Sequence, residues 1–293
     1  MREQRLVDAA PNQSDQQPAS QQSLRALDSR AGSSTRRRLE RDLRTAVAGG
    51  GLVLYYQPRL QLASGAIVAA EALLRWPHPR QGLISPATFF PIAERTDLVN
   101  EIGRFVLGTA CREAKAWPAS AGHPPPSVSV NVSPRQLTDG VLLDHVSAAL
   151  EFSDLPPERL ELELAENMLL EIDLETLLTL SAIRDLGVGL ALDNFGTAHA
   201  SLAMLKRLPL TAVKIDRSLI RGLPGDLEDA AIVRATIAIG DALGLTAVAE
   251  GIETESQRAF LSGIGCDEGQ GFLFSHPQPP AALATRLLLM AES

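Results

Sequence analysis

Cysteine is scarce in this 293-residue chain, which contains only Cys111 and Cys266. Two cysteines this far apart form no CxxC pair and no disulfide framework, so we expect both to be small buried residues in a reducing compartment. Long apolar runs are also missing. No stretch approaches the ~18 uninterrupted apolar residues of a membrane span, and the N-terminus has no apolar segment of signal-peptide length. The sequence therefore predicts a soluble, cytoplasmic protein that does not insert into a membrane.

An excess of basic charge is missing as well. Lys and Arg number 27 against 35 Asp and Glu, which gives a formal net charge of −8. A general binder of nucleic-acid polymers is expected to present a basic face, so this balance argues against one. It does not argue against a small phosphorylated ligand, because a bound metal ion can supply positive charge locally. The hydrophobic fraction of 45% is sufficient for a sizeable core.

The first part of the chain differs in composition from the rest. Residues 1–34 are rich in Gln, Ser, Asp and Ala and poor in large apolar residues, which predicts a flexible tail. Three arginines at 36–38 are then followed by apolar residues at helical spacing. This pattern predicts a helix whose basic start is a solvated face.

Beyond this helix the chain alternates between short apolar or β-branched segments and segments with helical spacing. The candidate strands cover residues 52–57, 67–73, 127–131, 160–164, 188–193, 212–215, 247–250 and 269–274. The clearest helical segments cover residues 102–116, 142–152, 175–186, 230–243 and 255–264. Alternation of this kind is typical of parallel βαβ units, and eight strands closing on themselves form a TIM-like (β/α)8 barrel.

The connection between the first two candidate strands is too short for a crossover helix. It contains Ser64-Gly65, which favours a hairpin, so we expect the first strand to run antiparallel to the others. A doubly wound open sheet is the alternative architecture. It would place a glycine-rich phosphate loop after the first strand, and no such loop is present. The predicted organisation is a tail over 1–34 and one barrel domain over 35–290.

Most candidate strands carry, at or near their ends, a polar residue suited to metal or phosphate chemistry. In chain order these residues are Glu71, Asn131, Glu163, Asp193, Lys214, Glu250 and Gln270. Because the carboxyl ends of barrel strands line one mouth, we expect these side chains to converge. One acidic residue beside a strand is usually a helix cap or an ion-pair partner, but seven polar residues at matching strand ends indicate a site. Hard oxygen ligands favour Mg²⁺, Mn²⁺ or Ca²⁺.

Lys214 lies in an otherwise apolar strand, and buried lysines are rare. We expect it to hold a nucleophilic water or a phosphate oxygen. The alternative is a purely structural ion pair with Asp216 or Glu250.

These polar residues belong to longer motifs that occur in one order along the chain. The motifs are Tyr56-Gln57-Pro58, Glu71-Ala72-Leu73-Leu74-Arg75-Trp76, Asn131-Val132-Ser133-Pro134, Glu161-Leu162-Glu163-Leu164-Ala165-Glu166, Asp193-Asn194-Phe195-Gly196-Thr197, Lys214-Ile215-Asp216, Ala249-Glu250-Gly251-Ile252-Glu253-Thr254 and Gln270-Gly271. Together they resemble the EAL domain family, the cyclic di-GMP phosphodiesterases of bacteria, over about residues 38–288. The family fold is a barrel with an antiparallel first strand, in agreement with the predicted hairpin.

The resemblance implies hydrolysis of one phosphodiester bond of cyclic di-GMP, which gives the linear dinucleotide pGpG. Two divalent ions, Mg²⁺ or Mn²⁺, would generate a hydroxide and neutralise the charge that builds on phosphorus. The implied ligands of the first metal are Glu71, Asn131, Glu163 and Asp193. Asp193 would bridge to a second metal, whose shell would include Asn194.

The same resemblance implies roles for six further side chains. Glu250 and Lys214 would position and activate the water, and Glu166 would brace the loop after the fifth strand. Gln57, Arg75 and Gln270 would contact the substrate, with Arg75 suited to bidentate phosphate recognition.

The loop after the fifth strand departs from the family pattern, which has two consecutive aspartates followed by Phe-Gly-Thr-Gly. Asn194 replaces the second aspartate and Ala198 the last glycine. Asn194 still offers a carbonyl oxygen but removes one negative charge from the second metal's shell, and Ala198 matters if the loop needs a positive φ. His199 stands where a tyrosine is frequent, and we expect it to be a surface residue.

Two functions of different class follow. The first is a metal-dependent phosphodiesterase, and the second is a catalytically impaired EAL domain that acts as a cyclic di-GMP receptor or a protein-interaction module. The chain keeps the six residues that matter most to the first function, namely Glu71, Asn131, Glu163, Asp193, Lys214 and Glu250. An unrelated metal-dependent barrel enzyme would require the motif order to be coincidental. The resemblance also implies a homodimer that pairs through the loop after the fifth strand and nearby helices.

Overall fold

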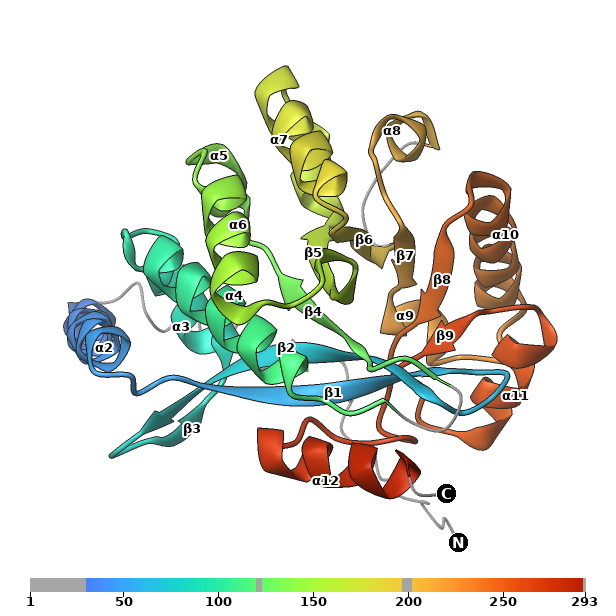
Figure 1. The fold of residues 1–293 in the computed structure, drawn as a ribbon, viewed down its shortest axis with the longest axis horizontal. Coiled ribbons are helices and arrows are strands. Elements are labelled where there is room, and N and C mark those ends of the chain that lie inside the picture. The colour runs from blue at the N-terminus through green and yellow to red at the C-terminus, as the bar shows by residue number, and fades with distance from the viewer. Residues whose placement is uncertain (1–29, 120–122, 197–201, 292–293) are drawn as a thin grey trace, which may run out of the picture.

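The structure is a computed structural model that describes residues 30–119, 123–196 and 202–291. Figure 1 shows strands surrounded by helices such as α4, α6, α7 and α10. In chain order the elements are α2 (Arg30–Ala48), β1 (Val53–Gln61), β2 (Ile67–His78), β3 (Gly82–Ile84), α3 (Pro86–Ala93), α4 (Leu98–Lys115), β4 (Ser127–Asn131), α5 (Pro134–Thr138), α6 (Leu142–Ser153), η1 (Pro157–Arg159), β5 (Leu160–Ala165), η2 (Glu166–Glu171), α7 (Leu174–Asp185), β6 (Gly189–Phe195), α8 (Leu202–Arg207), β7 (Ala212–Ile215), α9 (Arg217–Ile220), α10 (Leu227–Leu243), β8 (Thr246–Ala249), α11 (Glu255–Gly263), β9 (Glu268–Gly269) and α12 (Pro280–Ala291).

The sheet closes into a barrel of eight strands. Its order is β1-β9-β8-β7-β6-β5-β4-β2, and β1 also pairs with β2, while β3 extends β2 outside the ring. Strand β1 is antiparallel to both of its neighbours, whereas the pairs from β2 through β4 to β9 are parallel. The predicted (β/α)8 barrel with an antiparallel first strand is therefore confirmed.

Strand β5 shows why these sequences form barrel strands. Leu160, Leu162 and Leu164 alternate with Glu161 and Glu163, and successive side chains of a strand point to opposite faces. The three leucines are fully buried in the main hydrophobic core. The two glutamates, which are also buried, point into the barrel. Continuous burial on both faces is typical of a parallel barrel strand.

The last predicted strand, residues 269–274, is wrong beyond its first residue. Strand β9 covers only Glu268–Gly269, and the chain then turns. Gly271 lies against the backbone of Ile252, where an added Cβ would be only 2.1 Å from the carbonyl oxygen. Leu273 N donates to Ile252 O at 3.0 Å, so the loop bonds to its neighbour outside the strand ladder. The apolar spacing resembled a strand, but this close packing requires a turn at a glycine.

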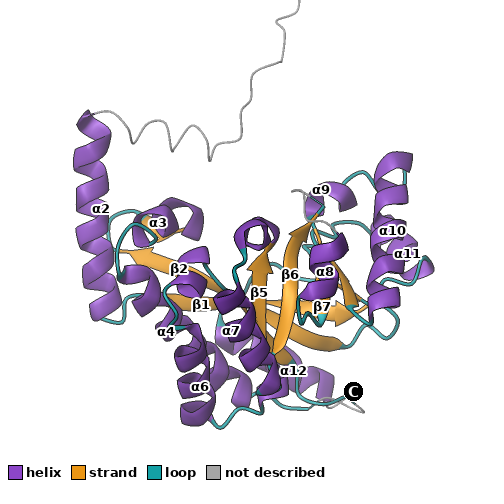
Figure 2. Ribbon diagram, turned by 90° about the horizontal axis from the view of Figure 1, so that it is seen from above, coloured by secondary structure: helices purple, strands orange, loops and turns teal. Residues whose placement is uncertain are grey.

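The N-terminal helix begins earlier than predicted. Helix α2 starts at Arg30, inside the segment expected to be a tail, and residues 1–29 lie outside the described residues. It lies beside α3 at one edge of the molecule, as Figure 2 shows. Across the described part of the chain, no helix combines the length and apolarity needed to cross a membrane.

Candidate active site

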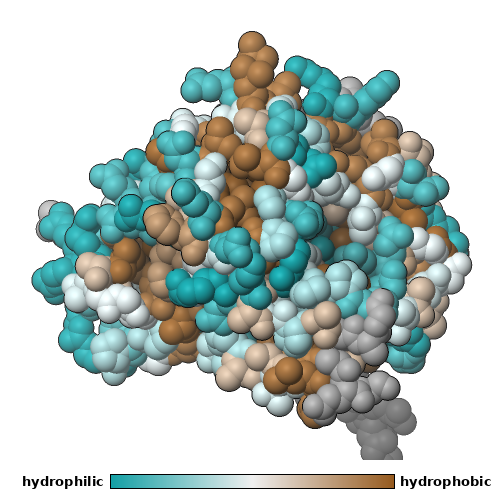
Figure 3. All heavy atoms as spheres, in the orientation of Figure 1, coloured by the Kyte–Doolittle hydropathy of each residue, from teal (hydrophilic) through white to brown (hydrophobic). Residues whose placement is uncertain are grey.

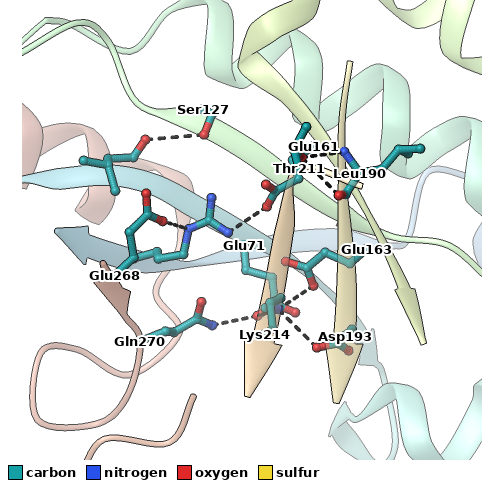
Figure 4. Close-up of polar contacts among 12 residues, drawn as sticks. Glu71, Ser127, Glu161, Glu163, Leu190, Asp193, Thr211, Lys214, Glu268 and Gln270 are labelled. Carbon is teal, nitrogen blue, oxygen red and sulfur yellow. Dashed lines mark hydrogen bonds and ion pairs between the residues drawn. The ribbon is translucent and has the colours of Figure 1, made fainter. Parts of the chain in front are cut away.

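The polar residues predicted at the strand ends gather at one mouth of the barrel. They come from most strands of the ring and surround Lys214 of β7, whose side chain is only 1% exposed. Figure 4 shows Glu71, Glu163, Asp193 and Gln270 around this lysine. The structure therefore brings these side chains together at the mouth, as the strand order predicts.

Four carboxylates surround the Lys214 ammonium. Its Nζ lies 2.7 Å from Glu163 Oε2 and 2.6 Å from Glu250 Oε1. It lies 3.4 Å from Asp193 Oδ1 and 3.9 Å from Glu71 Oε2. The ion pair with Glu250 was one of the alternatives for Lys214. Asp216 is not among the acids that surround this lysine, because its carboxylate accepts a hydrogen bond from Ser218 N and caps helix α9.

An amide network holds Glu71 from the other side. Asn131 Nδ2 donates to Glu71 Oε1 at 2.8 Å, and Gln270 Nε2 donates to Glu71 Oε2 at 2.6 Å. The Gln270 amide also lies 3.2 Å from Gln57 Oε1, while Gln57 Nε2 donates to Ser275 O at 3.0 Å. Both oxygens of Glu71 therefore have amide donors, which lock its orientation.

The electrostatics of this cluster are dominated by burial and by an excess of negative charge. Burial alone would lower the pKa of Lys214, but Glu163 and Glu250 outweigh it and raise that pKa well above its usual range. Burial raises the pKa of Glu163 well above its ordinary value, despite Lys214, and raises the pKa of Glu250 to about 7. For Glu71, Lys214 and the amide donors outweigh burial, and the pKa is lowered. One ammonium cannot neutralise four ionised carboxylates; this repulsion adds to burial in raising the pKa values of Glu163 and Glu250, and an added cation would relieve it.

The donors at this mouth fit a divalent cation chemically. They are carboxylate and amide oxygens, the ligands that Mg²⁺ and Mn²⁺ prefer. Glu163 is 1% exposed, and among the described residues its Oε1 has no hydrogen-bond partner, a costly arrangement for a buried carboxylate oxygen. Within the same part of the chain, no three His, Cys, Asp or Glu side chains are arranged to hold one metal ion. Four carboxylates instead surround the Lys214 ammonium.

Asn194 is the second-to-last residue of strand β6 and has a backbone φ of 58°, one of two non-glycine residues with positive φ in the described chain. Asparagine tolerates this left-handed conformation better than most residues. Its Nδ2 donates to Asp193 Oδ2 at 2.6 Å. An ionised aspartate in its place could not donate this bond, so Asn194 stabilises Asp193 in a way that an aspartate cannot.

Glu166 and Arg75 lie at the edge of the cluster. Glu166 is 2% exposed, and its Oε2 accepts a hydrogen bond from Gly196 N at 3.2 Å, at the start of the loop after β6. The half-buried Arg75 donates to Leu74 O at 2.8 Å and lies 5.9 Å from the centre of the Tyr55 ring. Ala198 and His199 lie outside the described residues.

Two cavities meet at Glu71. The larger, about 510 Å³, is mainly apolar and includes Phe90, Ile102 and Met168 in its wall. The smaller, about 210 Å³, is polar and is lined by Gln57, Glu71, Asp193, Arg217, Glu250, Gly251, Glu253, Gln270, Gly271 and Phe272. Sequence reasoning missed Arg217, Phe272 and Phe90 as lining residues. Arg217 and Phe272 directly follow quoted motifs and could have been found there, whereas nothing in its local sequence marks Phe90.

Comparison with known proteins agrees with this geometry. The family model for the EAL domain matches residues 40–277. The bifunctional diguanylate cyclase/cyclic di-GMP phosphodiesterase MucR of Pseudomonas aeruginosa is 44% identical over 242 residues, which cover 83% of this chain and 35% of MucR. The cyclic di-GMP phosphodiesterase NbdA of the same organism is 43% identical over 245 residues, 84% of this chain and 31% of NbdA.

A solved structure of the PaMucR phosphodiesterase in complex with c-di-GMP has the same fold. It matches with a TM-score of 0.79 at 43% sequence identity, covering 84% of this chain and 99% of that chain. The chain spans about a third of the length of the curated relatives MucR and NbdA. The family match, the ordered motifs and the closed barrel together show that this chain belongs to the EAL domain family.

Proposed function

We propose that this chain is a divalent-metal-dependent phosphodiesterase that hydrolyses cyclic di-GMP to pGpG. The observation that carries the proposal is the group of four acidic side chains around buried Lys214, between two cavities that share Glu71 as a wall. A cyclic dinucleotide carries a base on either side of its phosphodiester ring. With one base in each cavity, a phosphodiester would lie beside Glu71 and the acidic cluster.

The metal ligands proposed are the oxygen donors of the cluster, namely Glu71, Asn131, Glu163 and Asp193, and Asp193 and Asn194 would hold a second ion. Mg²⁺ or Mn²⁺ bound there supplies Lewis acidity and neutralises negative charge. The excess of carboxylate charge and the unpartnered Glu163 Oε1 support this assignment. A cation between these carboxylates would compete with the Lys214 ammonium for their oxygens.

The chain's own residues account for the proton transfers and the positioning. Glu250 accepts a proton from the attacking water, which a carboxylate with a pKa of about 7 does efficiently near neutral pH. The water oxygen bonds to phosphorus as the bond from phosphorus to the ribose 3′ oxygen breaks, leaving a 5′-phosphate and a 3′-oxygen anion that takes a proton from solvent to become a hydroxyl. Lys214 stabilises the negative charge of this transition state. Gln57, Arg75 and Gln270 orient the substrate.

Glu166 acts through the loop after β6 and does not itself contact the reacting atoms in this proposal. Its hydrogen bond to Gly196 N fixes the backbone directly after Asp193 and Asn194. We assign it to positioning the loop, and we expect its loss to weaken metal binding before it affects substrate binding.

A second function is favoured by one observation, the hydrogen bond from Asn194 to Asp193. This bond partly satisfies Asp193 without a metal ion, so it favours a domain that binds cyclic di-GMP without cutting it. The two functions differ in product formation, while both require ligand binding.

The test uses purified protein incubated with cyclic di-GMP and either Mg²⁺ or Mn²⁺, with pGpG followed by chromatography. We expect product from the wild type and none from Glu71→Gln, while Glu175→Gln, an exposed change on α7, serves as the matched control. Binding is measured in parallel by calorimetry with EDTA. Binding without product would establish the receptor, and product from Glu71→Gln at the wild-type rate would remove Glu71 from the metal site.

We further propose that the protein acts in the cytoplasm as a homodimer. Helix α7 exposes Leu174 and Leu178, which are 70% and 61% exposed. Figure 3 shows apolar side chains gathered at the top of the view, over the region of α7. A second copy covering this face would remove them from water, and sedimentation equilibrium that finds only monomer would contradict the dimer.

A further inference from the structure

A second charged cluster lies inside the barrel, below the one at the mouth. Arg59 of β1 is 5% exposed. Its Nη1 donates to Glu161 Oε1 at 2.7 Å, and its Nε forms an ion pair with Glu268 Oε2 at the same distance of 2.7 Å. In Figure 4 Glu161 and Glu268 lie apart from Lys214 and Asp193. We name Arg59, Glu161 and Glu268 the floor triad.

The floor triad joins strands whose direct backbone pairing with one another is absent or short. Strands β1 and β5 are not neighbours in the sheet, so no ladder of hydrogen bonds sets their separation. Strands β1 and β9 pair through only two residue pairs, and so do β8 and β9. The Arg59 side chain is therefore a direct link across the barrel between three strands.

On β1 and β5 a residue of the mouth lies two positions from the triad residue, and Gln270, directly after β9, lies two positions from Glu268. The pairs are Arg59 and Gln57 on β1, Glu161 and Glu163 on β5, and Glu268 and Gln270 at β9. Because side chains alternate along a strand, residues two apart point to the same face, here the barrel interior. A shift of one of these segments at the floor would therefore also displace its mouth residue.

The barrel leaves room for the triad. At Gly189 of β6, an added Cβ would lie 3.3 Å from Glu161 Cγ, so a larger residue there would crowd the Glu161 side chain.

Burial would lower the pKa of Arg59, but Glu161 and Glu268 outweigh it and raise that pKa. The guanidinium therefore stays charged and keeps both links.

We propose that the floor triad is a positioning element for the active site: by tying β1, β5 and β9 together, Arg59 sets where Gln57, Glu163 and Gln270 meet at the mouth. The inference concerns mouth geometry, and it rests on the proposed function only for the ligand used to measure it. Arg59, Glu161 and Glu268 touch no reacting atom in this arrangement.

The test separates positioning from simple stabilisation. Arg59→Met alone would leave two buried carboxylates without a partner and is expected to unfold the barrel partly or wholly. The informative variant replaces the whole triad with apolar residues of similar size, Arg59→Met/Glu161→Leu/Glu268→Leu. Arg59→Lys is the milder variant, because it keeps the charge but lacks the fork that reaches both acids. Lys115→Met, which removes the exposed ion pair with Asp154, is the control.

Two measurements are made on each folded variant. The first is the affinity for cyclic di-GMP in EDTA, which we expect to weaken at least about 10-fold in the triple variant and less in Arg59→Lys, with no change in the control. The second needs no ligand: the side-chain amide resonances of Gln57 and Gln270 in a ¹⁵N–¹H spectrum, which we expect to shift in both triad variants.

The outcomes distinguish the two proposals. If the wild type binds no cyclic di-GMP, the proposed function fails, and the amide resonances alone decide the role of the triad. If a triad variant melts at the wild-type temperature, binds with the wild-type affinity and shows both amide resonances at their wild-type positions, the triad only fills the barrel interior and our inference is wrong. If the triple variant does not fold, Arg59→Lys decides by the same two measurements.

Discussion

Replacing Asn194 by aspartate places a second carboxylate against Asp193. In the structure Asn194 Nδ2 donates to Asp193 Oδ2 at 2.6 Å. The substitution removes this donor and adds a like charge at nearly the same place. We therefore expect Asn194→Asp to destabilise the metal-free protein and to increase its affinity for divalent cations.

The size of the effect follows from the geometry. A hydrogen bond to a charged group contributes about 1.5–3 kcal/mol. Two like charges about 4 Å apart in an effective dielectric of 20 repel by about 4 kcal/mol. Asn194 is half-buried, so solvent screens much of this repulsion. We expect the free energy of unfolding to fall by about 3 kcal/mol in EDTA, which lowers the Tm by about 6–12 °C for a domain of this size.

The assay is thermal unfolding of wild type and variant in EDTA and in Mn²⁺, followed by circular dichroism. Mn²⁺ should stabilise Asn194→Asp more than it stabilises the wild type, because it binds between the two carboxylates. Asn194→Gly is the control, since glycine adopts a φ of 58° without strain and removes the hydrogen bond without adding charge. In EDTA its loss of stability should be smaller, and Mn²⁺ should stabilise it less than it stabilises Asn194→Asp. If Asn194→Asp melts in EDTA at or above the wild-type temperature, or gains no more from Mn²⁺, the electrostatic reasoning is refuted.

Three further predictions concern other parts of the molecule. Lys214→Met leaves Glu163 and Glu250 without their ammonium partner, so we expect the free energy of unfolding to fall by about 3–5 kcal/mol in chemical denaturation. Mn²⁺ should recover part of this loss. An unchanged denaturation midpoint would contradict the role of this lysine. Gly271→Ala would place its Cβ 2.1 Å from Ile252 O, so we expect at least about 3 kcal/mol of destabilisation by the same measurement. A stability loss below about 1 kcal/mol would show that the loop can move away. Burial raises the pKa of both cysteine thiols to about 12. Ellman's reagent at pH 8 should therefore label neither thiol in the native protein and both after denaturation. Rapid labelling of the native protein would show that one thiol is accessible.

Much of the barrel was predictable because its signals are local. The strand boundaries at Ser127–Asn131 and Ala212–Ile215 match the prediction at both ends, since a short β-branched run ends there at a polar residue or a helix cap. The antiparallel β1 followed from a connection too short for a helix. The polar residues at successive strand ends were found for the same reason, because parallel strands in a barrel bring their ends together.

The misjudged segment shows where local patterns fail. Residues 270–274 have the composition of a strand, yet Gly271 packs against the backbone of Ile252 and forces a turn. That contact joins two loops after different strands, and nothing near Gly271 in the sequence identifies Ile252 as its neighbour. The short pairing of β9 is a consequence of tertiary packing.

The chemistry of the interior divides in the same way. The sequence by itself determined which side chains reach the mouth, because alternation along a strand and the direction of that strand are local properties. Only the tertiary structure decided their partners: Lys214 among four carboxylates, Asn194 donating to Asp193, and Arg59 joined to Glu161 across 102 residues of chain. Closure of the barrel sets which strands face one another across the interior, and this depends on the whole sheet and on no single segment of the sequence.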